Sequence, residues 1–361
     1  MSYFRNIFLI LSMITSNLCF AYYAYVPDSS AQTVFVIDTT TNNVIDTVST
    51  GILPSFQAPS CIVTSPDGNS TYVGDFSGSL YVIDTNPNSA SFNTVTAVVP
   101  LPSMGGTPFS VAITPNGKTV YVGTDSSIQV FDTLSQSFIA PVTGTIIVEP
   151  VFSMAIYQDG SYAYALDIGS GLYVINTDST SGGYNTAINV IPGMGLTSIA
   201  FTPDGQFAFA SAAEGEVFAI FANPADMTWN QFAGTFNVPS PFTAFAEPWA
   251  LTINPEGSLV FILDVGNQCI YTADAENGQI IQQTSVALAL DPPFVQLGVV
   301  PDGSAVYITP FLPVIDVMDP TNYSISTVTN TNVVPITTPG GVSFVNISVE
   351  PRAFKRPSNR R

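Results

Sequence analysis

The amino-acid sequence predicts an all-β protein, a seven-bladed β-propeller of four-stranded blades. The first observation is a turn motif, Ser65-Pro66-Asp67-Gly68, that recurs with variations and whose glycines lie 43 to 52 residues apart. That period is typical of a four-stranded propeller blade and not of a helical solenoid. The second observation is a pattern of short apolar segments between turn residues, and the third is a seventh unit divided between the two ends of the chain. The five further copies of the turn lie at residues 114–117, 158–160, 202–205, 254–257 and 300–303.

The composition supports the all-β class. Of the 361 residues, 46% are hydrophobic and only 9% are charged, against roughly 25% charged residues in an ordinary soluble protein. The chain also contains 28 prolines and 26 glycines, with many Ser, Thr, Asn and Gln residues. Because these polar and turn-forming residues interrupt every apolar segment, the positive mean hydropathy does not indicate a membrane protein.

Each repeat has the same internal order of strands and turns. In the second copy, residues 108–113 form a first strand, the turn follows, residues 119–123 form a second strand, and residues 128–132 form a third. A looser fourth strand completes the unit. The turn has a physical basis, since Pro fixes φ at an early position, Asp or Asn caps the local backbone, and Gly adopts the positive φ that the hairpin needs.

The seventh unit is split between the two ends of the chain. Residues 23–26, 33–38 and 43–48 have the pattern of strands two to four but lack a first strand. Residues 342–347 follow the sixth copy of the turn at the spacing expected of that missing strand. We therefore expect the two ends to share one blade, which closes the ring and leaves no free sheet edge.

Residues 1–21 have the features of a signal peptide. Arg5 precedes an apolar stretch at residues 7–14 that is too short to span a bilayer, and Cys19 and Ala21 fit the −3 and −1 positions of a cleavage site. The alternatives are an uncleaved anchor and lipidation of Cys19. We expect an exported protein that resides in the periplasm or outside the cell.

Residues 22–350 are expected to form a single propeller domain and to be monomeric. Residues 351–361 carry five of the seven basic residues and too few apolar groups to fold, so they are predicted to be a disordered basic tail. The domain itself contains 26 acidic residues and one base, Lys118. Such an acidic body repels phosphate backbones, and this excludes nucleic acid as a partner.

The chain contains no histidine, and this removes Ser-His-Asp and Cys-His catalysis, zinc held by His, and haem with a proximal His. Cys61 and Cys269 remain after removal of the signal peptide, and an exported protein with two cysteines suggests a disulfide. However, Cys61 falls on the first strand of one repeat, and Cys269 falls on the third strand of a repeat four further on. We therefore expect two buried free thiols.

The repeat resembles that of the YVTN-type β-propeller proteins. The motif is matched at Ala24-Tyr25-Val26-Pro27, Thr71-Tyr72-Val73-Gly74 and Val120-Tyr121-Val122-Gly123, each followed by a strand that ends in Asp-Thr. The resemblance covers about residues 22–350 and weakens in the later repeats. It implies an exported seven-bladed propeller with a binding function. It also extends to lactonase-like propellers, but the mature chain lacks His and has no Arg before Arg352 to supply their polar catalytic groups.

Acidic residues recur in the turns between the second and third strands. These turns project on the face beside the central channel, where a ring of like charge is expected to collect cations or meet a basic partner. The alternative is that they cap their own hairpins. Oxygen ligands of this kind also suit Ca²⁺, the one cofactor we consider, although no compact calcium loop is present. The six acids are Asp28, Asp75, Asp125, Asp167, Glu214 and Asp264.

Two further sets of residues recur or stand out. Aspartates at the end of the third strand, such as Asp38 and Asp132, are expected to cap the following turn. Aromatic residues in the longer segments of the fifth and sixth repeats suggest inter-blade packing or contact with a protein or glycan. The segment 240–245, with Phe242 and Phe245, is the candidate contact insertion.

The sequence thus favours an exported binding or interaction scaffold with an acidic channel-side face. We assign no catalytic residue and no metal ligand. A Ca²⁺-dependent hydrolase or lactonase-like enzyme is the alternative, and a structural protein attached to the cell surface is a second alternative. The partner is expected to be a protein or a glycan, and the mature chain is expected to contain no transmembrane segment.

Overall fold

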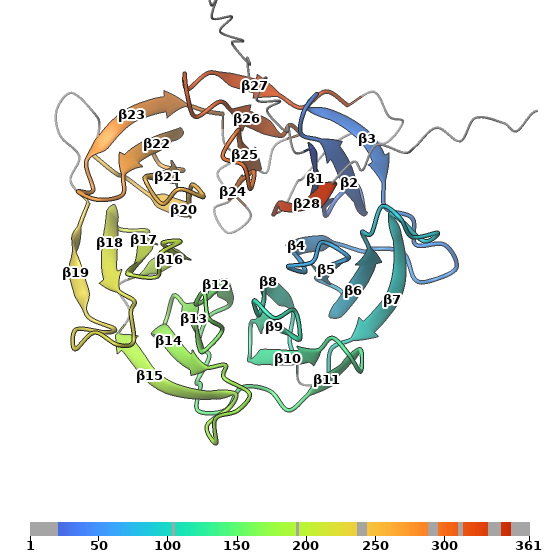
Figure 1. Cartoon of the computed structure of the whole chain (residues 1–361), viewed down its shortest axis with the longest axis horizontal. Coiled ribbons are helices and arrows are strands. Elements are labelled where there is room, and N and C mark those ends of the chain that lie inside the picture. The colour runs from blue at the N-terminus through green and yellow to red at the C-terminus, as the bar shows by residue number, and fades with distance from the viewer. Residues whose placement is uncertain are drawn as a thin grey trace, which may run out of the picture.

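The computed structural model of the chain contains seven four-stranded antiparallel sheets, arranged as blades around a common axis (Figure 1). It describes residues 21–102, 105–192, 195–236, 244–287, 295–309, 313–330 and 341–347. Within these ranges there is no helix, and therefore none that could cross a membrane. The predicted seven-bladed β-propeller is confirmed.

The first four blades contain the strands from the N-terminal half of the chain and one strand from its end. Blade one contains β28 (Ser343–Ile347), β1 (Ala21–Asp28), β2 (Thr33–Asp38) and β3 (Asn43–Thr47), and blade two contains β4 (Pro59–Thr64), β5 (Ser70–Asp75), β6 (Ser79–Asp84) and β7 (Thr94–Pro100). Blade three contains β8 (Pro108–Ile113), β9 (Thr119–Thr124), β10 (Ile128–Asp132) and β11 (Ser137–Ile139), and blade four contains β12 (Val151–Ile156), β13 (Tyr162–Asp167), β14 (Gly171–Asn176) and β15 (Thr186–Pro192).

The last three blades follow in chain order, and in each of them the first strand lies nearest the axis (Figure 1). Blade five contains β16 (Leu196–Phe201), β17 (Phe207–Ala212), β18 (Glu216–Phe221) and β19 (Phe232–Thr235), and blade six contains β20 (Pro248–Ile253), β21 (Leu259–Asp264), β22 (Cys269–Asp274) and β23 (Ile280–Ser285). Blade seven contains β24 (Gln296–Val299), β25 (Val306–Thr309), β26 (Asp316–Met318) and β27 (Ile325–Thr327).

Blade one closes the ring as predicted. Its innermost strand, β28, comes from the end of the domain and pairs antiparallel with β1, so that Tyr25 faces Ser343 and Ala21 faces Ile347. Sequence positions more than 300 residues apart therefore lie in one sheet. This pairing covers the edge of β1 that would otherwise be exposed.

The hydrophobic core is divided into seven clusters, and each lies between two neighbouring blades. Between blades two and three, for example, Leu80 and Tyr72 pack against Val120 and Phe131. Burial of apolar surface contributes about 25 cal/mol per Å², so each blade is stabilised mainly by its two neighbours and not by a core of its own.

Four of the seven blade interfaces share a hydrogen bond between a buried tyrosine and an asparagine. A tyrosine in the second strand of one blade donates its hydroxyl to an asparagine side chain in the turn between the third and fourth strands of the next blade. These asparagines have φ values from 52° to 65°, a left-handed conformation that asparagine tolerates better than most residues. The four Tyr–Asn bonds are Tyr25 to Asn93 (2.5 Å), Tyr121 to Asn185 (2.6 Å), Tyr164 to Asn230 (2.6 Å) and Tyr307 to Asn42 (2.7 Å).

The remaining interfaces differ at one or both of these positions. Phe209 replaces the tyrosine between blades five and six, and Phe261 replaces it between blades six and seven. Between blades two and three the tyrosine is present as Tyr72, but the left-handed residue is Gln136. The described residues of this interface therefore contain no Tyr–Asn bond. Tyr72 instead packs edge-on against Phe131, with ring centroids 6.0 Å apart.

The Tyr–Asn bonds lead to a matched prediction. We expect Tyr121→Phe to reduce the free energy of unfolding by about 1–3 kcal/mol, because it leaves the buried carbonyl oxygen of Asn185 without its donor. Tyr72→Phe removes the same atom from the same position in the neighbouring blade, where no such bond exists, and should change stability by less than about 0.5 kcal/mol. Urea unfolding of both variants measures the difference, and equal losses would contradict the role of the bond.

The innermost strands approach one another closely around the axis. The Ser110 hydroxyl on β8 donates to the carbonyl of Val151 on β12 at 2.5 Å, and the Thr197 hydroxyl on β16 donates to the carbonyl of Pro248 on β20 at 2.8 Å. Gly123 on β9 faces the first of these contacts. A β-carbon placed there would lie 2.4 Å from Ser110 Oγ and 2.7 Å from Val151 Cγ1. Glycine is therefore required by close approach of the neighbouring blade.

We expect Gly123→Ala to lower the free energy of unfolding by about 1–3 kcal/mol, because the added methyl group forces β8 and β12 apart. Gly234→Ala on the outer strand β19 is the control, since a β-carbon there would have no neighbour within 4 Å. Thermal and urea unfolding measure both variants. If Gly123→Ala is as stable as the control, the close packing around the axis does not limit this position.

Candidate functional site

The two faces of the propeller are defined by their turns. The turns between the second and third strands, and the segments that enter each first strand, lie on what we call the channel-side face. The turns between first and second strands, and between third and fourth strands, lie on the opposite face, which we call the turn face. The six acids expected to form a ligand ring belong to the channel-side face.

Asp75 shows what most of these acids do. The backbone N–H groups of Gln57 and Ala58 donate to its Oδ2 at 2.8 and 3.0 Å, and the N–H of Ser77 donates to its Oδ1 at 2.8 Å. Asp75 thus joins its own hairpin to the segment that leads into β4. A buried carboxylate is tolerated because several N–H donors compensate for the loss of water.

The same arrangement recurs in two other blades. Asp167 accepts bonds from the N–H groups of Val148 (2.8 Å), Glu149 (3.1 Å) and Gly169 (2.9 Å). Asp264 accepts bonds from Ala246 (2.8 Å), Glu247 (3.0 Å) and Asn267 (3.0 Å). The side chains of Asp28, Asp75, Asp167 and Asp264 are all fully buried.

The other two predicted acids lie in solvent. Asp125 follows Thr124, which occupies the position of the buried aspartates, and its Oδ1 accepts a bond from the N–H of Thr107 at 3.1 Å. Glu214 lies in the turn after β17, where Ala212 occupies the equivalent position. These two carboxylates are the members of the predicted ring that a ligand in solution can reach.

The acids do not converge on one point. Among the residues that the structure describes, no three acidic or thiol side chains lie close enough together to hold a metal ion. In the four buried aspartates, backbone N–H groups already donate to carboxylate oxygens. The arrangement of these acids therefore does not support the Ca²⁺ site considered from the sequence.

The candidate contact insertion falls partly outside the described residues, and Phe242 is among those not described. Phe245 is half-buried and packs edge-on against Tyr271 of blade six, with ring centroids 4.9 Å apart. Its carbonyl lies beside Gly215, one residue from Glu214, so these two predicted residues are close in space. Trp229 packs against Tyr162 at 5.3 Å and is an inter-blade contact, as the sequence suggested for most of these aromatics.

The structure places a row of aromatic rings at the axis that the sequence did not predict as a group. A β-bulge at the start of the first strand turns Phe109, Phe152 and Trp249 inward. Phe109 lies 5.3 Å from Phe152, which lies 6.4 Å from Trp249, and Phe76 extends the row 5.3 Å beyond Phe109. We call these four half-buried side chains the aromatic row. The signal in the sequence was an aromatic residue at the second position of three different first strands.

A small cavity of about 100 Å³ lies beside the aromatic row. Its lining includes Phe109, Phe152, Ser153 and Gln296 from the innermost strands. It is smaller than the roughly 300–1,000 Å³ typical of a ligand pocket.

The two cysteines lie apart on β4 and β22, and both are buried and free, as predicted. Burial raises the pKa of the Cys61 thiol to about 12 and that of Cys269 to about 11. Both thiols therefore stay protonated at neutral pH and are poor nucleophiles.

Comparison with solved structures supports the fold. The chain is similar to a hydrazine synthase structure from Kuenenia stuttgartiensis, with 17% identity, a TM-score of 0.61, and coverage of 85% of this chain and 91% of the other. It is also similar to a functionally unknown protein from Desulfotomaculum acetoxidans, with 16% identity, a TM-score of 0.71, and coverage of 90% and 99%. No family model and no curated protein sequence matches the chain. The class established is therefore the seven-bladed β-propeller.

The buried aspartates generate a prediction on stability. We expect Asp167→Asn to cost about 1–3 kcal/mol, because both of its carboxylate oxygens accept backbone bonds and an amide nitrogen can replace neither. Glu214→Gln, on an exposed side chain of the same face, is the control and should change the free energy of unfolding by less than about 0.5 kcal/mol. Urea unfolding at pH 7 measures both variants. Equal effects would show that Asp167 does not hold the loops of its blade.

Proposed function

We propose that this protein is an exported propeller of the YVTN type that acts as a binding scaffold, and that its channel-side face receives a cationic segment of a partner protein. The single observation that carries the proposal is that the aromatic row and two exposed carboxylates, Asp125 and Glu214, belong to the same face. Aromatic faces attract cations such as Lys and Arg side chains, and carboxylates at the rim add Coulomb attraction.

The charge of the domain supports a cationic ligand. Residues 22–350 have a net charge of −25, with Lys118 as the sole base. Lys118 lies in the turn between β8 and β9, on the turn face, so no basic side chain of the described residues opposes a cation at the channel-side face. A field of one sign raises the association rate of an oppositely charged partner, and this effect decreases as salt increases.

Export is the part of the proposal that comes from the sequence. The predicted signal peptide, residues 1–21, supports a location in the periplasm or outside the cell. The resemblance to YVTN-type propellers agrees with that location and with a binding role. The hydrazine synthase named above shares the fold at 17% identity and contributes nothing further to this proposal.

The test uses a fluorescent hexa-arginine peptide as the probe, with anisotropy as the measurement. We expect saturable binding that weakens as salt is raised, and about a tenfold weaker affinity for Trp249→Ala, since a cation over an aromatic ring contributes about 1–2 kcal/mol. The double variant Asp125→Asn/Glu214→Gln should also weaken binding.

A second double variant provides the matched control. Asp159→Asn/Asp302→Asn removes the same charge from exposed aspartates on the turn face. If the channel-side face is the site, this control binds the peptide nearly as the unmodified protein does. Equal weakening by both double variants, with no effect of Trp249→Ala, would indicate attraction to the overall charge and would contradict a defined site.

A further inference from the structure

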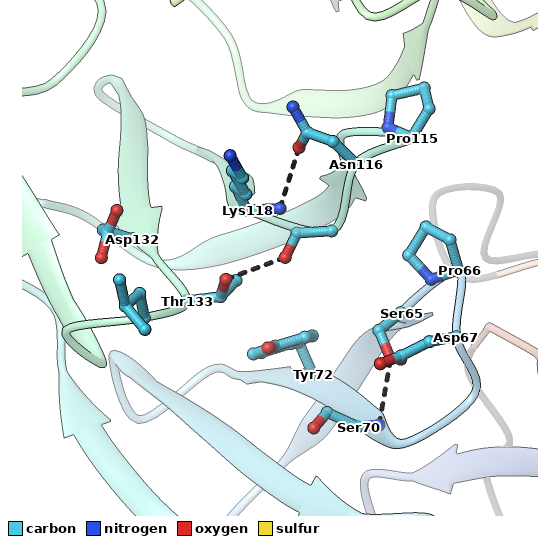
Figure 2. Close-up of a pocket in the computed structure, with 12 residues that line it drawn as sticks. Ser65, Pro66, Asp67, Ser70, Tyr72, Pro115, Asn116, Lys118, Asp132 and Thr133 are labelled. Atoms are coloured by element: carbon cyan, nitrogen blue, oxygen red, sulfur yellow. Dashed lines mark hydrogen bonds between the residues drawn. The ribbon is translucent and has the colours of Figure 1, made fainter.

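The interface between blades two and three contains a hollow of about 740 Å³ on the turn face (Figure 2). Three turns surround it: residues 65–70 of blade two, and residues 115–118 and 132–134 of blade three. Tyr72 forms its inner wall, and Leu134 stands exposed at its rim. The volume lies within the roughly 300–1,000 Å³ of ordinary ligand sites.

Other interfaces show what occupies this space when it is filled. In blades two, four and five, the turn between the third and fourth strands is nine or ten residues long and contains, at or near its end, an aromatic residue followed by the left-handed asparagine of the Tyr–Asn bond. The aromatic side chain packs against the preceding blade. These contacts are Phe92 with Tyr23 (6.2 Å between ring centroids), Tyr184 with Thr119 (3.3 Å between hydroxyls) and Trp229 with Tyr162 (5.3 Å between ring centroids).

Blade three lacks both residues. Its turn has only four residues, Thr133 to Gln136, with Ser135 at the aromatic position and Gln136 at the asparagine position. In blade two, the residue that would meet the missing aromatic side chain is Ser70, which lines the hollow. The hollow is therefore the space that an aromatic-Asn turn fills elsewhere in this chain.

The walls of the hollow retain the groups that such a turn would meet. Tyr72 makes no Tyr–Asn bond, and its hydroxyl has the side chain of Ser70, which also lines the hollow, as its polar neighbour. Lys118, an exposed side chain, lies on the opposite wall, and its ammonium group makes no ion pair with any residue that the structure describes. By contrast, the Asp67 and Asn116 side chains accept bonds within their own turns, for example from the N–H of Lys118 to Asn116 at 3.0 Å. A ligand would thus meet donors and apolar surface, together with the carboxylate of Asp132, which also lines the hollow.

We propose that the hollow between blades two and three binds an exposed turn of a partner protein that carries an aromatic residue followed by asparagine. The aromatic ring enters the space beside Ser70, and the asparagine oxygen accepts the bond from Tyr72. Lys118 donates to a backbone carbonyl or a carboxylate of the same turn. An aromatic side chain buried in a preformed pocket is the usual anchor of a protein interface. This site lies on the face opposite to the aromatic row, so it does not depend on the function proposed above.

The first experiment uses a peptide whose sequence the chain itself supplies. The probe is residues 85–94 with blocked ends, Thr-Asn-Pro-Asn-Ser-Ala-Ser-Phe-Asn-Thr, and the control peptide has Ser and Gln in place of Phe92 and Asn93, as blade three has. We expect the full-length protein to broaden the NMR signals of the probe, with at least tenfold weaker binding of the control. Tyr72→Phe and Lys118→Gln should each weaken binding of the probe severalfold, whereas Tyr121→Phe, at an occupied interface, should not.

A second experiment fills the hollow from within the chain. Replacing residues 133–136 by the sequence of residues 85–93 gives blade three the long turn of blade two. We expect this variant to melt at a higher temperature than the natural protein and to lose binding of the probe, because the grafted turn occupies the site at high effective concentration. The proposal is overturned if the probe binds the graft variant as well as the natural protein, if the control peptide binds equally well, or if N-acetylphenylalanine amide alone matches the probe.

Discussion

The pairing of β28 with β1 is the contact on which the rest of the propeller depends. Each blade is stabilised by the clusters it shares with its two neighbours, so a ring in which blade one lacked its inner strand would expose two of the seven clusters, those with blades two and seven. The same loss would leave an open edge on β1 next to the axis. Because β28 and β1 are separated by over 300 residues, this contact has a high entropic cost of loop closure, and the intervening blades reduce that cost as they stack in order. Stacking of the blades therefore brings β28 and β1 together, and their pairing in turn stabilises the stacked blades.

A closed ring of seven similar units needs a way to make neighbouring blades fit, and two devices serve this purpose. Around the axis, hydroxyl groups such as that of Ser110 bond to the next inner strand, and Gly123 permits the approach.

Farther out, the Tyr–Asn bond joins blades through a residue with positive φ. The tyrosine is replaced by phenylalanine only where the left-handed residue of the next blade is not asparagine. Opposite Phe209 that residue is Gly278 of blade six, and opposite Phe261 it is Tyr323 of blade seven. Tyrosine and asparagine are thus lost together at two interfaces, and only Tyr72 is kept without the asparagine. This difference is the reason we propose the hollow beside Tyr72 as a site.

The sequence predicted the fold in detail because its information is local. The Pro-Asp-Gly turns, the strand order within a repeat and the split blade all follow from residues near one another or from the spacing of copies. The role of the acids was harder to assign, since Asp75 bonds to Gln57 and Ala58, which precede it by 18 and 17 residues, and hairpin spacing alone does not reveal that contact. The aromatic row depends on a bulge that rotates a single side chain of the first strand, as at Trp249, and a bulge has no reliable signature in one sequence. The hollow depends on the short turn of blade three, with Ser135 and Gln136 in place of an aromatic residue and asparagine, and this difference is apparent only when the turns of the blades are compared.

Burial of four acids also changes what the charge of this domain means. A sequence with one base and 26 acids suggests a ring of carboxylates open to cations, yet Asp28, Asp75, Asp167 and Asp264 are enclosed, with backbone N–H groups as partners. Enclosed charges still contribute to the field outside the protein, because that field sums over all charges, buried and exposed, but they cannot contact a ligand. Long-range attraction of a cation therefore depends on all the acidic residues, whereas direct contact with it depends only on the exposed ones. In the function we propose, the enclosed acids and the rest of the domain attract a cation toward the channel-side face, and exposed or half-buried side chains such as Asp125, Glu214 and Trp249 determine where it binds.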